Sequence, residues 1–370
     1  MSFAGARPPA AVLRRIGVRT SAALTAVVLA ALVAGLLLLL VGQDPLVAFG
    51  GLVDGSVGSS TNLLATLAQT TPLLLAALSF VVAFQAGIFN AGGQGQVVIG
   101  AFTAAAVGSW PPLGVLPGSM QVLVVVLAGA AGGAIWALPP ILMKIAWRTS
   151  EILTSLLLSY VAELLNGFLV QGHFRAKSVQ PGTNAQTESL LPGAHFPHLA
   201  AGSQVTFLLP VGVLLAIAAW WMLRRTTLGY EMTFHGKSPL AARAAGVNIT
   251  KVSVIAMMLS GALAGIAGAA IVGGVFQADT TPFPPDIGFN AILAALLVGS
   301  SALLVPFSAF FFGALTQGGL GLQIFTGTSQ YIASVITATI ILFAAPRALP
   351  DGVLRASRTA RRRLTRKARR

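Results

Sequence analysis

Few side chains in this sequence could bind a polar solute or carry a proton, and the most isolated of them is Glu163. It stands well inside the apolar stretch from residue 151 to residue 171. A carboxylate at the centre of a bilayer costs about 2.5–3.5 kcal/mol on insertion scales, so it must face protein or water. Glu163 could line a path for a solute or relay protons, or it could make a structural hydrogen bond between helices. Together with Asn166, three residues further on, it is expected to form one polar face.

A second polar group interrupts the apolar region at residues 85–96, which read QAGIFNAGGQGQ. Glycines let backbones pack closely, and amides buried in hydrocarbon need partners. Non-helical backbone at membrane depth is tolerated only where protein or a water-filled cavity covers it. The segment therefore indicates a broken helix near a solute path. A tight cytoplasmic turn between two apolar helices is the alternative.

The third group is the polar insert from residue 227 to residue 251, which also carries clustered positive charge. Ser238 can cap a short helix there, Pro239 suits its first position, and Gly246 can close it in the left-handed conformation. The helix, residues 239–245, would be only about 10 Å long and unstable alone in water. We expect a docking surface for a partner on the cytoplasmic face, with an ordinary membrane-surface loop as the alternative.

Membrane helices must position these groups, because the composition provides no other scaffold. The chain has 370 residues, of which 55% are apolar and 9% charged, whereas soluble domains carry roughly 25% charge. Apolar runs of about twenty residues, the length of a membrane span, recur from end to end. The sequence predicts an all-α polytopic membrane protein with about ten transmembrane helices, at residues 21–42, 62–84, 97–110, 120–146, 151–171, 204–223, 251–276, 288–300, 303–318 and 328–346.

The distribution of positive charge predicts the orientation. With these spans, all of the 23 Lys and Arg residues except Arg175 and Lys177 fall on one side, which is the cytoplasmic side by the positive-inside rule. Both termini are then cytoplasmic. The chain divides into a cytoplasmic N-terminal segment (1–20), a transmembrane domain (21–346) with a cytoplasmic loop (224–251), and a basic cytoplasmic tail (347–370). Despite the net charge of +14, the tail is expected on anionic lipid rather than on nucleic acid.

Two further patterns concern packing. Residues 259–274 read LSGALAGIAGAAIVGG, with small residues three and four apart, which indicates a close-packing helix surface. The triplet Phe-Asn-Ala occurs at residues 89–91 and again at residues 289–291. The two triplets follow the second and seventh expected spans on opposite sides of the membrane, as two inverted repeats of five spans would place them.

Several classes of chemistry are excluded by what is missing. The chain has no cysteine, no HExxH and no GxSxG motif, and the GKS at residues 236–238 lacks the glycine that a phosphate-binding loop requires. We therefore expect no enzyme, no cofactor and no metal site. If transport is driven by ATP, the ATPase is a separate chain.

Several stretches together resemble the membrane permeases of bacterial ABC importers for nucleosides and simple sugars, a family related to the branched-chain amino acid and ribose permeases. Residues 89–96, FNAGGQGQ, are similar to the family pattern Phe-Asn-Ile-Gly-x-Glu-Gly-Gln, with Gln94 where a Glu is usual. Residues 228–230, LGY, and residues 236–247, GKSPLAARAAGV, are similar to its cytoplasmic pattern, with Leu240 where a Glu often begins the coupling helix. The resemblance covers roughly residues 60–345.

The resemblance implies how the parts work together. The short helix would sit in a groove on an ABC ATPase subunit, a second permease subunit, identical or homologous, would complete the pore, and an extracellular solute-binding lipoprotein would deliver the solute. The residues assigned to ATPase coupling are Ser238, Pro239, Ala241, Ala242, Arg243 and Gly246. The residues assigned to the substrate path are Phe89, Asn90, Gln94, Gln96, Glu163 and Asn290. Amides suit an uncharged, polyhydroxylated solute because they donate and accept hydrogen bonds without a net charge.

The expected location is the bacterial inner membrane. Two other functions stay open at this point. The chain could be a secondary transporter that uses Glu163 to couple solute movement to protons or sodium. It could also be an ABC permease for branched-chain amino acids.

Overall fold

The computed structural model describes residues 32–40, 42–177, 184–200, 202–284 and 286–327, together with 335, 338 and 339. The described residues fall into two compact units, one within residues 1–55 and 318–370 and the other formed by residues 56–317. The predicted N-terminal segment (1–20), the basic tail (347–370) and nearly all of the expected span 328–346 lie outside the described residues.

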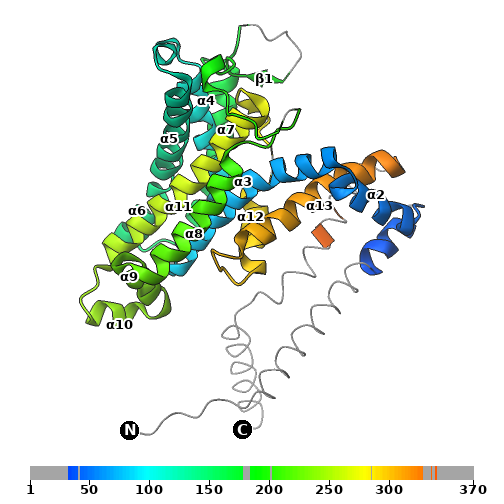
Figure 1. Cartoon of the computed structure of the whole chain (residues 1–370). Coiled ribbons are helices and arrows are strands. Elements are labelled where there is room, and N and C mark those ends of the chain that lie inside the picture. The colour runs from blue at the N-terminus through cyan, green and yellow to red at the C-terminus, as the bar shows by residue number, and fades with distance from the viewer. Residues whose placement is uncertain are drawn as a thin grey trace, which may run out of the picture. The chain divides into compact units, whose positions relative to one another are not determined.

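Helices form almost all of the regular structure (Figure 1). The helices of the larger unit are α3 (Ser60–Gln85), α4 (Gly93–Gly108), α5 (Gly118–Trp136), α6 (Leu138–Trp147), α7 (Glu151–Gln171), α8 (Leu208–Arg225), α9 (Thr227–Lys237), α10 (Pro239–Ala244), α11 (Ile249–Ile271) and α12 (Ile287–Leu297). A π-helical turn, Val272–Phe276, continues α11, and short 3₁₀ turns lie at Pro111–Val115 and Pro192–Ala194. Strand β1 (Ala185–Gln186) pairs antiparallel with β2 (Thr280–Thr281).

The smaller unit contains most of α2 (Pro45–Val57) and the end of α13 (Val305–Thr326), which begins in the larger unit. Its core is small and apolar, formed by Ala34, Leu38, Ala48 and Leu322. Gly55 and Gly321 let α2 and α13 approach closely, because a Cβ on Gly55 would lie only 2.5 Å from the Gly321 Cα.

Six helical segments in the described part of the chain are long and apolar enough to cross a membrane, and a bent helix pair at residues 32–57 would bring the number to seven. The prediction of about ten spans is therefore not confirmed. The expected spans 97–110 and 288–300 correspond to α4 and α12, which have 16 and 11 residues. Each is too short to cross a bilayer alone, since a span needs about twenty residues.

The centre of the larger unit is α11, which packs against α3, α4 and α5. The predicted small-residue surface is confirmed. A Cβ on Gly265 would collide with the Gly129 carbonyl oxygen of α5, and one on Gly268 would collide with the Val97 carbonyl oxygen of α4. The helices therefore approach to backbone contact, as small residues allow in membrane bundles.

Two local features of the larger unit follow from proline chemistry and from strand pairing. The helical run over residues 118–147 is interrupted at Ala137, next to Pro139 and Pro140, since proline removes a backbone hydrogen bond. Strand β2 lies in the segment between α11 and α12, and its pairing with β1 joins this segment to the loop before α8. The β1–β2 pair and α10 lie at opposite ends of the larger unit (Figure 1).

Candidate functional site

Gln94 is the side chain that connects the predicted path residues in space. It is buried in the first turn of α4. Its Oε1 accepts a 2.8 Å hydrogen bond from the Gly288 N–H, and its Nε2 lies 3.4 Å from both the Glu163 Oε1 and the Pro284 carbonyl oxygen. One amide therefore contacts α7, the start of α12 and the segment before α12.

The two short helices begin at this point and run apart. From Gly93, α4 leads toward the end with the β1–β2 pair, where the Gly108 carbonyl oxygen accepts from the Leu191 N–H at 2.9 Å. From Ile287, α12 leads toward the other end, where the Ser300 carbonyl oxygen accepts from Gln85 Nε2 at 2.9 Å. Two helix N-termini thus meet beside the Glu163 carboxylate, and helix N-termini favour negative charge.

Glu163 itself lies on the exposed side of α7, surrounded by exposed apolar side chains such as Leu164 and Phe168. It borders a depression of about 490 Å³ whose wall also includes Gly167, Gln171 and Thr281. The prediction that Glu163 and Asn166 form one polar face is wrong. Asn166 is buried, because its side of α7 packs against the interior while the Glu163 side is uncovered in the described part of the chain.

Asn90 and Gln96, by contrast, form a closed pair inside the protein. Asn90 Nδ2 donates to Gln96 Oε1 at 2.8 Å, and Gln96 Nε2 donates back to Asn90 Oδ1 at 3.1 Å. Asn90 Nδ2 also donates to Ser260 Oγ at 2.9 Å, and Ser260 Oγ lies 3.0 Å from Ser79 Oγ. This buried network joins α3, α4 and α11 and has no open side.

The other two predicted path residues have different surroundings. Phe89 packs edge-on against Phe80, with ring centroids 5.1 Å apart. Asn290 lies on α12 and is half-buried. The structure therefore brings Gln94 and Glu163 together, places Asn90 and Gln96 in a separate network, and leaves Phe89 and Asn290 outside both.

One buried carboxylate was not predicted as a site. Asp279 is fully buried, and neither of its carboxylate oxygens makes a hydrogen bond of good geometry. Burial raises its pKa to about 7, and the nearby Asn166 side chain and Thr280 N–H offset this only in part. The sequence gives a weak signal for it, since an Asp between apolar residues and two threonines is typical of an exposed loop.

The predicted docking helix is present as α10, Pro239–Ala244. Gly246 has φ +82° and ends it as expected, and the Val247 N–H bonds back to the Ala242 carbonyl oxygen at 3.0 Å. The predicted Ser238 cap is wrong in its chemistry, because Ser238 occupies the N-cap position but its side chain makes no capping hydrogen bond.

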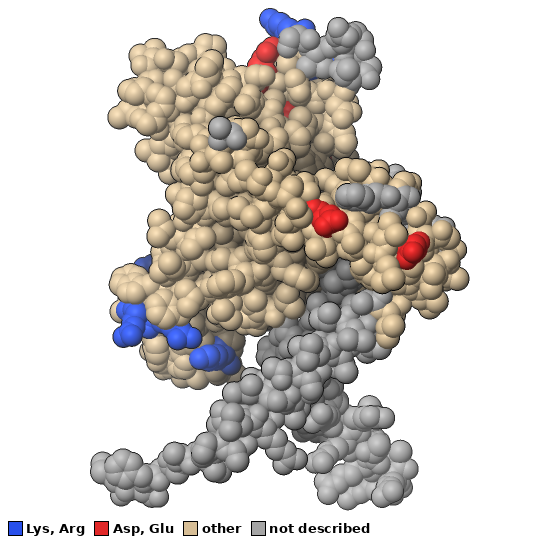
Figure 2. All heavy atoms as spheres, turned by 45° about the vertical axis from the view of Figure 1, so that its right-hand side comes forward, with Lys and Arg blue, Asp and Glu red and all other residues tan. Residues whose placement is uncertain are grey.

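Most of α10 is exposed. Pro239, Ala241 and Arg243 are exposed, Leu240 is 83% exposed, and Ala242 is the buried residue that holds the helix to its own chain. Most of the visible Lys and Arg side chains gather at this end of the molecule (Figure 2). A groove of about 670 Å³ beside α10 is lined by α8 and α9 residues that include Arg224, Arg225, Tyr230 and Glu231.

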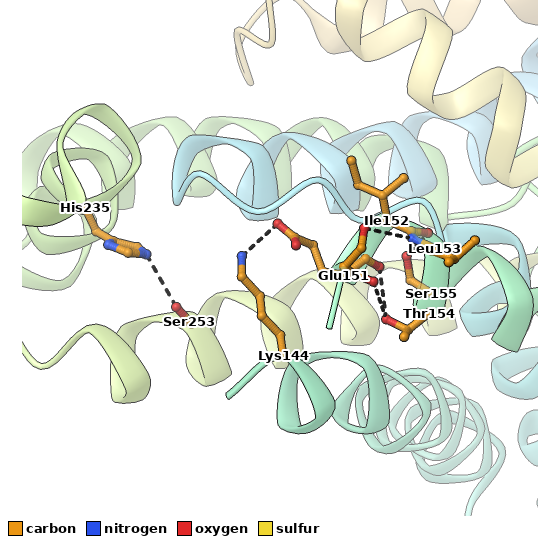
Figure 3. A network of polar contacts seen from close by, with 9 residues as sticks. Lys144, Glu151, Ile152, Leu153, Thr154, Ser155, His235 and Ser253 are labelled. Carbon is orange, nitrogen blue, oxygen red and sulfur yellow. Dashed lines mark hydrogen bonds and ion pairs between the residues drawn. The ribbon is translucent and has the colours of Figure 1, made fainter. Parts of the chain in front are cut away.

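Polar contacts tie this end to the helices behind it (Figure 3). Lys144 of α6 forms a 2.7 Å ion pair with Glu151, the first residue of α7. His235 Nε2 of α9 lies 3.5 Å from Ser253 Oγ of α11. Burial and the Lys144 charge lower the pKa of His235, so the neutral imidazole is favoured. These contacts connect α9 to α11 and α6 to α7.

The chain is similar in sequence to a known family and to several transport proteins. Residues 62–345 match the family described as "Branched-chain amino acid transport system / permease component". The chain is 34% identical to a glucose ABC transporter permease protein of Haloferax volcanii, with 85% of this chain and 84% of the relative covered. It is 29% identical to a nucleoside ABC transporter permease of Lactococcus lactis (90% and 92% covered) and 27% identical to a guanosine ABC transporter permease of Bacillus subtilis (87% and 92% covered).

The match covers the paired helix starts, the buried amide network and the exposed helix α10. ABC transporter permeases are non-enzymatic membrane components, which agrees with the lack of catalytic motifs in the sequence. The chain belongs to the family of permease components of branched-chain amino acid-type ABC transport systems.

Proposed function

We propose that this chain is the transmembrane permease of an ATP-driven importer for nucleosides or related simple sugars, coupled to a separate ATPase through α10. The observation that carries the proposal is the exposure of α10. A six-residue helix is too short to be stable in isolation, and Leu240, which is 83% exposed, offers an apolar side chain to a partner. The relatives named for glucose, nucleosides and guanosine support the solute class.

The solute path of the proposal runs along the exposed side of α7. A carboxylate midway along a membrane span cannot face lipid without cost. The Glu163 side of α7 is therefore covered by a second permease subunit, identical or homologous, or by water in a path between the two subunits. Gln94 and Gln171 beside it supply neutral donors and acceptors for hydroxyl groups. Phe89, Asn90, Gln96 and Asn290 would join the path only in another conformation.

The paired helix starts support the proposed inverted repeat. The two Phe-Asn-Ala triplets lie just before α4 and within the first turn of α12, and these helices run in opposite directions from the Gln94–Gly288 contact. In the proposal each short helix is one arm of a discontinuous span, so that about ten spans form two halves of five. Both termini are then cytoplasmic, in the bacterial inner membrane.

The remaining partners follow from the two ends of the larger unit. The end with β1 and β2 would receive the extracellular solute-binding lipoprotein, and the basic end with α10 would face the ATPase and the inner lipid leaflet. Nothing in the proposal needs a cofactor or a nucleic acid.

The test is affinity purification of the full chain from membranes in mild detergent, followed by uptake assays. We expect an ABC ATPase subunit to co-purify with the wild type. Arg243→Glu, which reverses an exposed charge on α10, should weaken the association and reduce uptake at least tenfold. Solute transport by the pure chain reconstituted without an ATPase would overturn the proposal.

A second candidate is a secondary transporter coupled through Glu163, and the exposed position of this carboxylate midway along α7 favours it. That function predicts that a protonophore abolishes uptake and that the chain transports on its own. The branched-chain amino acid alternative is separated from the main proposal by substrate competition. If the chain is a branched-chain amino acid permease, labelled leucine should be taken up. Unlabelled leucine should then compete with this uptake, whereas adenosine, guanosine and glucose should not.

A further inference from the structure

A second cavity of the larger unit has no part in the solute path. It holds about 360 Å³ and is walled by the ends of α3, α8 and α9 and by the turn after α12. Among the described residues, the charged side chains in its wall are Arg224 and Lys237, and none is acidic. Glu231 lines the neighbouring groove next to α10 instead.

Arg224 and Lys237 have no acidic partner in the part of the chain that the structure describes, where neither side chain forms an ion pair. The Arg224 guanidinium lies over the Trp220 ring, 5.5 Å from its centroid, which fixes the charge at the cavity wall. The cavity therefore carries two unpaired positive charges.

The turn after α12 supplies hydroxyl groups to the same wall, from Ser300 and Ser301. Gly299 and Ser300 both have left-handed backbone conformations, with φ +62° and +56°, and Gln85 Nε2 holds this turn by donating to the Ser300 carbonyl oxygen. Ser300 is buried, and its Oγ has no hydrogen-bond partner among the described residues. A buried hydroxyl without a hydrogen-bond partner destabilises the protein by its full desolvation penalty, unless a ligand forms the missing bond.

Cations and hydroxyl donors in one cavity recognise phosphate oxygens. The rest of the wall is mixed, with the polar side chains Gln85, Thr233 and Ser301 beside an apolar part formed by Trp220, Leu223 and Ala302. Trp220 lies in the last turns of α8, where tryptophans mark the membrane–water interface. A soluble phosphate would not need the apolar part, whereas a phospholipid would bury its glycerol and upper acyl carbons there. We infer that this cavity binds the phosphate headgroup of an anionic phospholipid of the inner leaflet through Arg224, Lys237 and Ser300.

The test uses the purified full chain, stripped of lipid in detergent and titrated with phosphatidylglycerol while native mass spectrometry counts the bound molecules. The wild type should bind one molecule of phosphatidylglycerol tightly. Arg224→Gln combined with Lys237→Gln should weaken this binding roughly tenfold or more, because each basic residue near the headgroup contributes to it. The matched control is Arg225→Gln combined with Lys251→Gln, two cations outside the cavity, and it should bind as the wild type does.

Folding and ligand source are controlled separately. The charge-preserving pair Arg224→Lys and Lys237→Arg should keep most of the binding and the wild-type melting temperature. Equal losses in the cavity variant and the control variant would show non-specific attraction and overturn the site. Binding of inorganic phosphate that competes with phosphatidylglycerol at equal concentration would keep the phosphate site but overturn the lipid as its ligand.

Discussion

Gln94 and Gln96 lie two residues apart at the start of α4, yet they have opposite surroundings. Gln96 forms a reciprocal amide pair with Asn90, with contacts of 2.8 and 3.1 Å. Gln94 makes one 2.8 Å bond to the start of α12 and two contacts of 3.4 Å, one of them to Glu163. Both glutamines are buried, but only the Gln94 contacts lead to an exposed carboxylate.

The difference indicates that two polar side chains of one short motif have different roles, one in stability and one in transport. A closed network at membrane depth stabilises the fold because every donor has an acceptor. A network with long bonds and an open carboxylate can exchange its partners for those of a solute at low cost. We therefore expect the Asn90–Gln96 side to govern stability and the Gln94–Glu163 side to govern transport.

Asn90→Leu should have the largest effect on stability. The substitution leaves the Gln96 amide and the Gly92 N–H without the partner that Asn90 supplies, at about 1–3 kcal/mol for each buried group. The Ser260 hydroxyl keeps its contact with Ser79. We expect a loss of about 2–6 kcal/mol, measured by thermal or denaturant unfolding of the purified chain. Asn290→Leu is the matched control from the second Phe-Asn-Ala triplet.

Asn290 is the middle residue of the second triplet, as Asn90 is of the first, but its side chain is only half-buried. Its replacement should change the free energy of unfolding by less than about 1 kcal/mol. If the two asparagines proved equally costly to replace, the closed amide network would not be what distinguishes them.

Asp279→Asn should have the next largest effect, and it depends on pH. An unfolded Asp releases its proton near pH 3.9, whereas Asp279 in the folded protein releases it at about 7. Between these values the folded state binds more protons, so the stability of the wild type falls as pH rises through this window. On going from pH 5 to pH 8, the uncharged variant should gain about 3 kcal/mol of stability relative to the wild type.

The measurement is the melting temperature of both proteins at pH 5 and pH 8. Asp286→Asn, an exposed carboxylate a few residues further on, serves as the control and should show no such difference. A wild type that became more stable than Asp279→Asn on going to pH 8 would show that this carboxylate has a charged partner.

Glu163→Gln should have the smallest effect on stability and a clear effect on transport. The side chain is exposed, so the free energy of unfolding should change by less than about 0.5 kcal/mol. Loss of a charged hydrogen-bond acceptor should reduce uptake about tenfold. Uptake of labelled solute into membrane vesicles containing the complete transporter measures this. Normal uptake by the variant would show that Glu163 is not part of the path. It would contradict the expectation that the Gln94–Glu163 side governs transport.

Local features of the fold were predictable where short-range chemistry decides them. The bounds of α7, residues 151–171, agree with the prediction because charged or polar residues flank one apolar run. The position of α10 follows from Pro239 and Gly246, and the break at Ala137 follows from the two prolines after it.

The parts that were not predictable depend on contacts between distant residues. The sequence does not show that Glu163 and Asn166 lie in different surroundings, because burial depends on which helices cover α7. Asp279 and its raised pKa depend on packing against α7 and on the β1–β2 pair, whose strands are almost a hundred residues apart and only two residues long. The expected count of about ten spans is not confirmed in the described residues, because α4 and α12 are each shorter than a span.

Cysteine labelling at α10 tests whether this helix faces the cytoplasm and contacts an ATPase subunit. The chain has no cysteine, so Leu240→Cys and Leu199→Cys each place a single thiol at an exposed position. A membrane-impermeant maleimide applied to intact cells should label the Cys variant at 199, while the variant at 240 should react only after permeabilisation and should cross-link to the ATPase subunit. Labelling at 240 from outside intact cells would contradict the claim that α10 faces the cytoplasm and receives the movement of an ATPase.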